Sequence, residues 1–400
     1  MKRYGNPDYL LFAAAAIATM FGIIAVWDAG YAESAVKGEG FPRAVLMQSL
    51  FALAGFAGCW LLSRLPAEKL RKYAWPAVIV TALLLVGVLV LGKPVNGATR
   101  WFRFGPASFQ PSEVAKLTCI LFLASAFAGH TAWKSVRTGS LRLWLGRWLF
   151  PKIARAWPLI PVVAVVGLIE LQPDLKTAMV IVVTSAFMLY AAGVSHKSFV
   201  TVAVVVALVG AAAVVDKPYR LTRILSHGDR WSESKIDSIG FQTTQSETAL
   251  AMGGVLGKGF GQGRAKYTLP EPTSDFVLAT IGEEAGLVGS IAVIGLLGFI
   301  VWRLYRQGME RVDRFQRLTL VGIACWIGIQ TVANVVVANG AIPVMGVPLP
   351  FFSAGGSSLL ALWLAIGVAQ SVVRSPNILV ESGEPVRQPE QEPARRAYVR

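Results

Sequence analysis

The chain has 400 residues, of which 54% are hydrophobic and only 15% are charged. Its mean hydropathy of +0.55 excludes an ordinary soluble domain. A net charge of +15 would suit a nucleic-acid-binding protein, but the basic residues cluster between apolar runs, a distribution that membrane orientation explains better. Cys59, Cys119 and Cys325 lie inside apolar runs at no motif spacing, which indicates small core residues and neither disulfides nor metal ligands.

Ten apolar runs have the length and composition of transmembrane helices, with ends defined to within several residues. They lie near residues 8–28, 45–63, 74–92, 113–129, 157–171, 177–194, 198–215, 275–302, 318–338 and 352–373. The sequence therefore predicts an all-α, polytopic integral membrane protein in which residues 1–374 form one transmembrane domain. The first run is too long for a signal peptide and has no small-residue cleavage site, so we expect a retained anchor.

Lysines and arginines concentrate on the connections that follow the second, fourth and eighth runs, and the alternate connections hold far fewer. By the positive-inside rule, both termini are expected in the cytoplasm. The 130–156 connection mixes tryptophans and leucines with arginines, which predicts an amphipathic helix on the cytoplasmic leaflet or a basic interfacial loop. The tail at 375–400 is rich in Pro, Glu, Gln and Arg and is expected to be disordered.

The opposite face then carries the large loop at 216–274 and the acidic residue that follows it. We expect Thr273 or Ser274 to cap the eighth helix and Asp275 to lie in its first turn, with Glu283 and Glu284 deeper in the same helix. Carboxylates at the mouth of a membrane helix are costly unless they are hydrated, paired or used. Asp275 either faces an aqueous cavity or belongs to a plain helix cap above two buried, hydrogen-bonded glutamates.

A second charged group is expected at the same face. Glu113 and Lys116 are three residues apart, so they share one face of the fourth helix and can pair at the membrane boundary. This pair either positions a carboxylate across the cavity or only fixes the loop at 93–112. In the turn at 170–176, Lys176 is expected to do no more than solvate a hairpin.

The remaining external loops are rich in arginine, glycine and proline. Arg220, Arg223 and Arg230 either meet phosphates or form a solvated face. Six glycines between 253 and 263 permit close backbone approach, to a ligand or to another segment. The loop at 339–358 predicts a re-entrant or broken start to the tenth helix.

Five runs together resemble the SEDS family (shape, elongation, division and sporulation), typified by FtsW and RodA. The runs are NGATRWFRFGPASFQPSEVAKL at 96–117, QPDLKTA at 172–178, FQTTQSETALAMGGVLGKGFGQG at 241–263, LPEPTSDFVLATIGEEAGLVG at 269–289 and GVPLPFFSAGGSSLL at 346–360. The resemblance covers residues 8–374, with the runs in the order of the family. The glycine-rich run and the LPE–DF segment resemble the division protein slightly more than the elongation protein.

The resemblance implies a ten-helix enzyme of the bacterial cytoplasmic membrane, with its active site facing outside. Such an enzyme is a peptidoglycan glycosyltransferase that polymerises lipid II, in cell division or elongation, beside a class B penicillin-binding protein and other membrane proteins of the same machinery. Asp275 matches the family's essential aspartate, and Glu113 and Lys116 match a charged pair of the same cavity.

Several residues are candidates for binding the substrate. They are Arg100, Arg103, Arg220, Arg223, Gln245, Ser246 and Ser357. No metal ligands are predicted, although a divalent cation (Mg²⁺ or Mn²⁺) is an alternative source of positive charge for the diphosphate.

Four motifs depart from the family pattern and bear on the loop contacts to the substrate. Thr273-Ser274 stands where His-Thr is frequent, Lys176 replaces a common glycine, and Ala354 replaces a tyrosine. The family's GSGG reads AMGG at 251–254.

In the mechanism that the resemblance implies, Asp275 takes the proton of the acceptor's sugar hydroxyl while a polyprenyl diphosphate leaves the donor sugar. Two other classes of function fit ten helices: a lipid II flippase or transporter, and a scaffold that recruits a synthase. The crowding of charge at one external face favours the polymerase over a transport path across the membrane.

Overall fold

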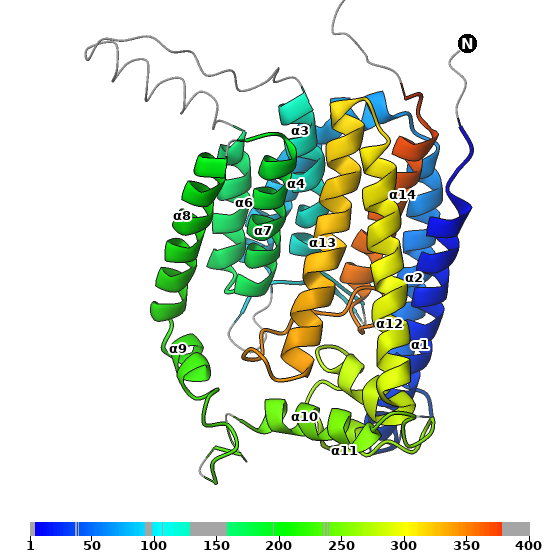
Figure 1. The fold of residues 1–400 in the computed structure, drawn as a ribbon, viewed down its shortest axis with the longest axis vertical. Coiled ribbons are helices and arrows are strands. Elements are labelled where there is room, and N and C mark those ends of the chain that lie inside the picture. Colours follow the sequence, from blue (N-terminus) through cyan, green and yellow to red (C-terminus); the bar gives the residue numbers. More distant parts are fainter. Residues whose placement is uncertain are drawn as a thin grey trace, which may run out of the picture.

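The computed structural model describes residues 5–36, 38, 40–92, 98–105, 107–128, 158–194, 196–233, 235–236, 238 and 240–377. Ten apolar helices of this part of the chain form a bundle (Figure 1): α1 (Tyr9–Val36), α2 (Arg43–Ser63), α3 (Ala67–Leu91), α4 (Pro111–Ala128), α6 (Leu159–Leu171), α7 (Leu175–Ala191), α8 (His196–Val215), α12 (Val277–Met309), α13 (Arg314–Ala338) and α14 (Gly356–Arg374). They correspond to the ten predicted runs, and the predicted fold class is confirmed.

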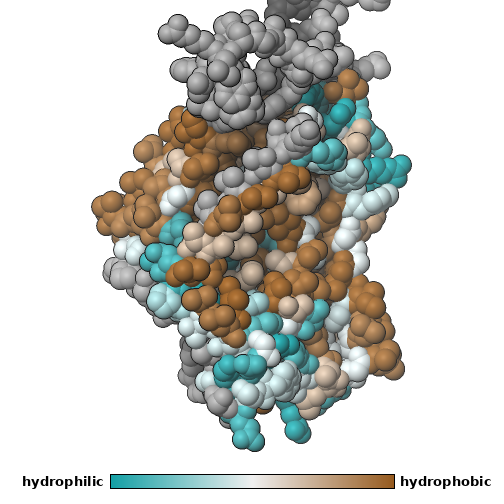
Figure 2. Space-filling view, turned by 60° about the vertical axis from the view of Figure 1, so that its left-hand side comes forward, coloured by the Kyte–Doolittle hydropathy of each residue, from teal (hydrophilic) through white to brown (hydrophobic). Residues whose placement is uncertain are grey.

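Seven helices of the described part, α1 to α4 and α12 to α14, are long and apolar enough to cross a membrane. Of the other three, α6 and α7 are apolar but have only 13 and 17 residues. Leu53 on α2 and Leu83 on α3 are 68% and 65% exposed, as expected of side chains that face lipid. Figure 2 shows apolar residues gathered over the middle of one face and hydrophilic residues at its lower end.

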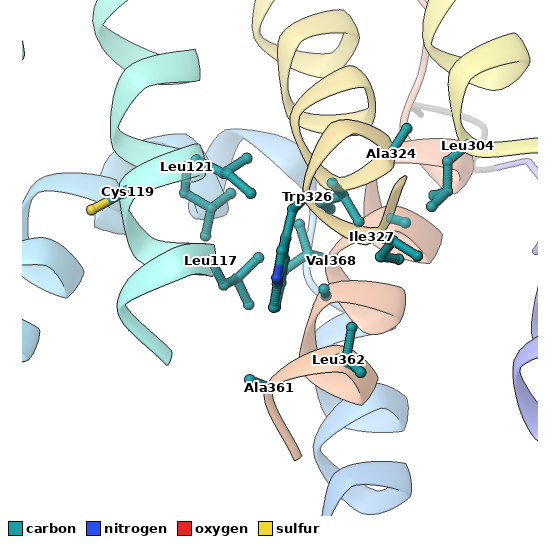
Figure 3. Packing of buried hydrophobic residues seen from close by; sticks show 14 of the residues in the cluster. Leu117, Cys119, Leu121, Leu304, Ala324, Trp326, Ile327, Ala361, Leu362 and Val368 are labelled. Atoms are coloured by element: carbon teal, nitrogen blue, oxygen red, sulfur yellow. The ribbon is translucent and has the colours of Figure 1, made fainter. Parts of the chain in front are cut away.

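The core lies where α4, α13 and α14 meet. Trp326 of α13 is fully buried, and Figure 3 shows Leu117 and Leu121 of α4 to the left of its ring and Ala361 of α14 below it. Cys59 and Cys119 are buried and unbridged, as the sequence predicts. These helices are central because their apolar residues continue around most of the helix, which leaves no wide polar face for water.

The two ends of the described chain lie at the same end of the bundle (Figure 1). The backbone N–H of Gly5 donates to the carbonyl of Arg374 at 2.8 Å, and Asp8 accepts from Arg303 of α12 at 2.7 Å. Residues 375–377 are also held here, since Ser375 is buried and accepts a hydrogen bond from Ala67 N. The prediction of disorder from residue 375 is therefore wrong for these three residues, while 378–400 and the predicted 130–156 amphipathic helix lie outside the described residues.

The opposite end of the bundle carries the large loop predicted at 216–274. It contains three short helices, α9 (Pro218–Leu225), α10 (Phe241–Gly253) and α11 (Ala265–Thr268), and Figure 1 shows α10 and α11 lying across this end. The loop at 93–112 contains a small antiparallel hairpin formed by β1 (Phe102–Phe104) and β2 (Ala107–Phe109). This hairpin was not predicted from the sequence.

Helix α12 is interrupted at Gly286, whose backbone has φ 67° and ψ −163°. The glycine-rich loop packs against the interruption: Lys258 N and Gly259 N donate to the carbonyls of Glu283 and Glu284, each at 3.0 Å. In return, the backbone N–H groups that follow Gly286 donate to carbonyls of the loop. The backbone groups freed by the break are thus satisfied within the protein, as a membrane helix requires.

The side chains of the two glutamates hold the same loop. Glu283 pairs with Lys258 at 2.8 Å and accepts from Ala265 N, while Glu284 accepts from Gly261 N and Gly263 N. Lys266 connects Glu284 of α12 to Asp28 of α1, at 2.9 and 2.7 Å. Both glutamates are therefore structural anchors, which was one of the two sequence-based interpretations, and the close approach predicted for the glycines is to another segment of this chain.

We expect Gly286→Ala to lower the unfolding free energy by about 2 kcal/mol, because a side chain at this φ is strained. The added methyl group would also lie 2.4 Å from the backbone nitrogen of Gly257. Gly295→Ala in the same helix is the matched control, since nothing lies within 4 Å of its added methyl. Thermal unfolding of the detergent-solubilised variants measures the difference, and equal melting temperatures would contradict the packing described.

Candidate functional site

Asp275 lies in the turn that precedes α12, not in the first turn of the helix as predicted. The helix begins at Val277, Phe276 occupies the N-cap position, and no side chain caps the helix. The expected caps, Thr273 and Ser274, are part of the same turn. The prediction of a capped helix that includes Asp275 is therefore wrong.

Tertiary hydrogen bonds to three consecutive carbonyls explain this start. The carbonyl of Thr273 accepts from Ala354 N at 2.8 Å, and that of Ser274 accepts from the hydroxyl of Ser353 at 2.5 Å. The carbonyl of Asp275 accepts from Asn334 Nδ2 of α13 at 3.0 Å. Because these carbonyls are bound by other segments, they do not accept the bonds with which a helix would continue toward its N-terminus.

The Asp275 carboxylate faces the loop that leads into α14. A methyl group added to Gly346 would lie 3.0 Å from Asp275 Oδ2 and 3.4 Å from Lys176 Nζ, so the two side chains approach the same glycine. Lys176 Nζ donates to the carbonyl of Gly346 at 2.5 Å. Gly346 has φ 69°, which favours glycine independently of the space around it.

Burial raises the pKa of the Asp275 carboxyl above its ordinary value, and the negative charge of Glu271 raises this pKa further, while the positive charges of Lys176 and Arg223 lower it. The net shift is upward, toward the range in which a carboxylate accepts a proton more readily. A carboxylate with this environment is suited to general base catalysis.

Glu113 and Lys116 of α4 form the predicted ion pair, with 2.7 Å between Oε2 and Nζ, and both side chains are buried. Lys116 Nζ also lies 3.4 Å from Gln330 Oε1 of α13 and 5.2 Å from the ring centre of Trp326. The indole N–H of Trp326 donates to the same Gln330 oxygen.

One face of α13 links this pair to the Asp275 turn. Trp326, Gln330 and Asn334 follow one another at intervals of four residues, so they lie along one stripe about 12 Å long. Gln330 contacts Lys116, and Asn334 donates to the carbonyls of Asp275 and Val347, at 3.0 and 2.8 Å. The charged pair and the aspartate are thus connected through α13 without a direct contact between them in the described residues.

Most of the predicted substrate-binding residues have polar atoms that are engaged within the fold. Arg100 donates to the carbonyls of Gln172 and Pro173, and Arg220 pairs with Glu170 at 2.5 Å. Ser246 donates to Ala338 O, and Ser357 bonds to Gln110 N and Ser108 O beside the hairpin. Arg103 is exposed on β1, and Gln245 is half-buried on α10. Of the seven candidates, Arg223 is the one whose charge acts on Asp275.

Lys176 lies near Asp275, although the sequence did not predict a role for it at the site. It was expected only to solvate a hairpin, but it lies in the first turn of α7 and reaches the loop at Gly346, 170 positions away in the chain. Its neighbour Asp174 is buried, accepting from Gln110 Nε2 and Ser112 at 2.9 and 3.2 Å. The replacement of a common family glycine by Lys176 was the sequence signal that could have identified it.

A cluster of three or more histidine, cysteine, aspartate or glutamate side chains that could hold a metal ion is absent from the described residues.

The fold and the site define a multi-pass helical membrane protein that presents a carboxylate of raised pKa and neighbouring cations at one end of its bundle. The family model described as "Cell cycle protein", for the FtsW, RodA and SpoVE proteins, matches residues 8–377. The chain belongs to this family, the SEDS proteins, and resembles its FtsW members.

Among curated relatives, the chain is 33% identical over 378 residues to a probable peptidoglycan glycosyltransferase FtsW of Trichlorobacter lovleyi, covering 92% of this chain and 94% of that protein. It is also 33% identical over 372 residues to stage V sporulation protein E of Bacillus subtilis, covering 92% and 97%.

Two solved structures share the fold over most of their length. One is a chain of a peptidoglycan synthase complex, described as coordinating polymerization and crosslinking, with a TM-score of 0.72, 30% identity, and coverage of 92% of this chain and 98% of that chain. The other is the rod shape determining protein RodA of Thermus thermophilus, with a TM-score of 0.65, 28% identity, and coverage of 92% and 97%.

We expect Lys116→Met and Glu113→Gln, made singly, each to lower the unfolding free energy by about 3 kcal/mol, because each removes a partner from a buried ion pair. The double variant should lose much less than the sum of the two, since it leaves no unpaired charge. Thermal unfolding of the four proteins forms a double-mutant cycle. Additive losses would show that the pair is not energetically coupled.

Proposed function

We propose that this protein is a peptidoglycan glycosyltransferase that polymerises lipid II into glycan strands, with Asp275 as its general base. The observation that carries the proposal is the Asp275 turn: three tertiary hydrogen bonds hold its backbone, while burial and Glu271 raise the pKa of the carboxyl group. The names of the FtsW relatives support the reaction class.

In the proposed reaction, the 4-hydroxyl oxygen of the acceptor sugar attacks the anomeric carbon of the donor. The new C–O bond forms as the bond from that carbon to the diphosphate breaks, and the hydroxyl proton passes to Asp275. The bonding electrons leave with the diphosphate, whose charge Lys176 would stabilise. Lys176 approaches the same glycine as the Asp275 carboxylate and lowers the pKa of that carboxyl group, which supports this role.

The buried Glu113–Lys116 pair has a supporting part in this proposal. Through Gln330 and Asn334 of α13, which are both buried, it would keep the Asp275 turn in register with α4. Both residues would thus act through the position of the aspartate. Movement of α13 relative to α4 would change the site without changing its residues.

Orientation and partnership follow from the same proposal. The positive-inside rule places both termini in the cytoplasm, so Asp275 and the loop at 216–274 would face outside, where the cell wall is built. A class B penicillin-binding protein is the proposed partner, because the similar solved chain belongs to a complex described as coordinating polymerization and crosslinking. The apolar surfaces of the membrane helices would contact lipid and the polyprenyl tail of the substrate.

A lipid II flippase or a scaffold for the synthase remains the alternative. A flippase requires polar groups along a path through the bundle. The polar groups of the candidate site gather instead at the end of the bundle opposite the termini. They are the Asp275 turn, Lys176, Arg223 and the glycine-rich loop held by Glu283 and Glu284, and their position favours chemistry at one face.

We expect Asp275→Asn and Asp275→Ala to lower polymerisation of labelled lipid II by about 10²- to 10⁴-fold, the usual contribution of a general base. The assay uses purified protein with and without its cognate penicillin-binding partner. Asp229→Asn is the matched control, because Asp229 is an exposed aspartate of the same loop, paired with Lys235 at 3.1 Å. Full activity in both Asp275 variants would remove the aspartate from the mechanism, and a partnered wild type that makes no glycan would favour the flippase or the scaffold.

The rate should also depend on pH through Asp275, which works only when deprotonated. Lowering the pH should reduce the rate as Asp275 becomes protonated. Because the pKa of Asp275 is raised, this loss should begin at a higher pH than it would for an aspartate of ordinary pKa. Lys176 lowers this pKa, so Lys176→Met should move the acid limb of the pH–rate profile further upward. The exposed Lys217 provides the control variant Lys217→Met. An acid limb that stays in place or moves downward in Lys176→Met would contradict this electrostatic coupling.

A further inference from the structure

A cavity of about 450 Å³ lies beside the Asp275 turn, between α9, the start of α10 and the loop at 343–344. Its lining includes Tyr219, Arg223, His227, Arg230, Phe241 and Gln242. Its volume is within the range of pockets that enclose a small organic ligand. None of the residues that we have assigned to proton transfer or to the Glu113–Lys116 pair lines it.

Two segments connect this cavity to Asp275. Arg223 Nη1 donates to the carbonyl of Val344 at 3.1 Å, and Gly346, two residues further on, lies against the Asp275 carboxylate. Pro270, also in the lining, begins the stretch that ends at Asp275. A ligand in the cavity would therefore be a direct neighbour of a substrate that reacts at Asp275.

The charge of the cavity favours an anion. Among the residues that the structure describes, its lining contains Arg223, Arg230 and His227 but no aspartate or glutamate. Glu247 neutralises Arg230 at 2.7 Å, whereas Arg223 donates to the neutral carbonyl of Val344. The charge of Arg223 is therefore available to an oxyanion.

The other lining residues distinguish between the anions of the proposed substrate. The diphosphate continues directly into a long apolar tail, which needs an apolar groove. This cavity instead offers side-chain hydroxyl and amide groups, including those of Thr222, Ser226, Gln242 and Thr243, beside two aromatic rings. Hydroxyls, an amide and a cation suit a peptide with a carboxylate.

We propose that the cavity binds the peptide stem of the lipid-linked substrate and that Arg223 holds a stem carboxylate. This inference rests on the proposed function and adds a subsite to it. The stem would be bound at the side of the reacting sugar, so that binding energy from a part of the substrate remote from the reaction would orient the sugar at Asp275.

The test measures binding without turnover, in the Asp275→Asn protein reconstituted in nanodiscs. The probes are two lipid II molecules, one with free stem carboxylates and one with those carboxylates amidated. We expect the acidic stem to bind about tenfold more tightly, in line with a hydrogen bond to a charged group, and we expect Arg223→Gln to abolish that preference. Lys217→Gln, at the N-cap position of α9 and outside the lining, removes a charge from the same segment and should leave the preference intact.

Equal affinities for the two stems in the Asp275→Asn protein would overturn the proposal. Undecaprenyl diphosphate, which has no stem, is the third probe: an equal loss of its affinity in Arg223→Gln would assign Arg223 to the diphosphate and also overturn the proposal. If Arg223→Gln does not fold, Arg223→Lys and Gln242→Leu provide the same comparison, with a reduced preference expected in each. Since binding is measured without catalysis, a failure of the polymerase assignment in the activity assay is distinguishable from a failure of the stem subsite.

Discussion

The site depends on the hydrogen bonds that three consecutive carbonyls accept just before α12. Ala354, Ser353 and Asn334 donate to the carbonyls of Thr273, Ser274 and Asp275. These donors come from two other segments, so the turn is fixed relative to α13 and to the start of α14. The Asp275 side chain remains free to project from a rigid backbone, which is the arrangement that a reacting group needs.

The loop that leads into α14 is itself held by α2. Gln48 donates to the carbonyl of Ser353 at 3.0 Å and accepts from Gly355 N at 3.1 Å, so one buried side chain satisfies both directions of the irregular backbone. Nonhelical backbone at this depth is tolerated because protein groups replace water as partners. The interruption of α12 at Gly286 follows the same rule, with the glycine-rich loop supplying the partners.

Buried charges in this protein are of two kinds. Lys266, Asp28 and Glu284 form a network that connects α1, α11 and α12. Burial lowers the pKa of Lys266, but its two carboxylate partners hold that pKa above its ordinary value. Asp275 differs because its nearby cations do not offset its burial, so its pKa is raised. Asp28 and Glu284 connect helices through Lys266, whereas the Asp275 carboxylate faces the loop at Gly346.

The ten helices, the buried cysteines and the Glu113–Lys116 pair could be predicted from the amino-acid sequence alone. The two segments that carry Asp275 and Gly346, at 269–289 and 346–360, could also be recognised there. Hydrophobic run length and i,i+3 spacing are local properties, so they are legible without coordinates. Three further features became apparent from the three-dimensional structure: α12 begins after Asp275, it breaks at Gly286, and Lys176 reaches Gly346. The hairpin at 102–109 and the internal bonding of Ser246 and Ser357 also emerged only there. Each of these features depends on partners distant in the chain, and local propensity does not specify which distant carbonyl or side chain will be near.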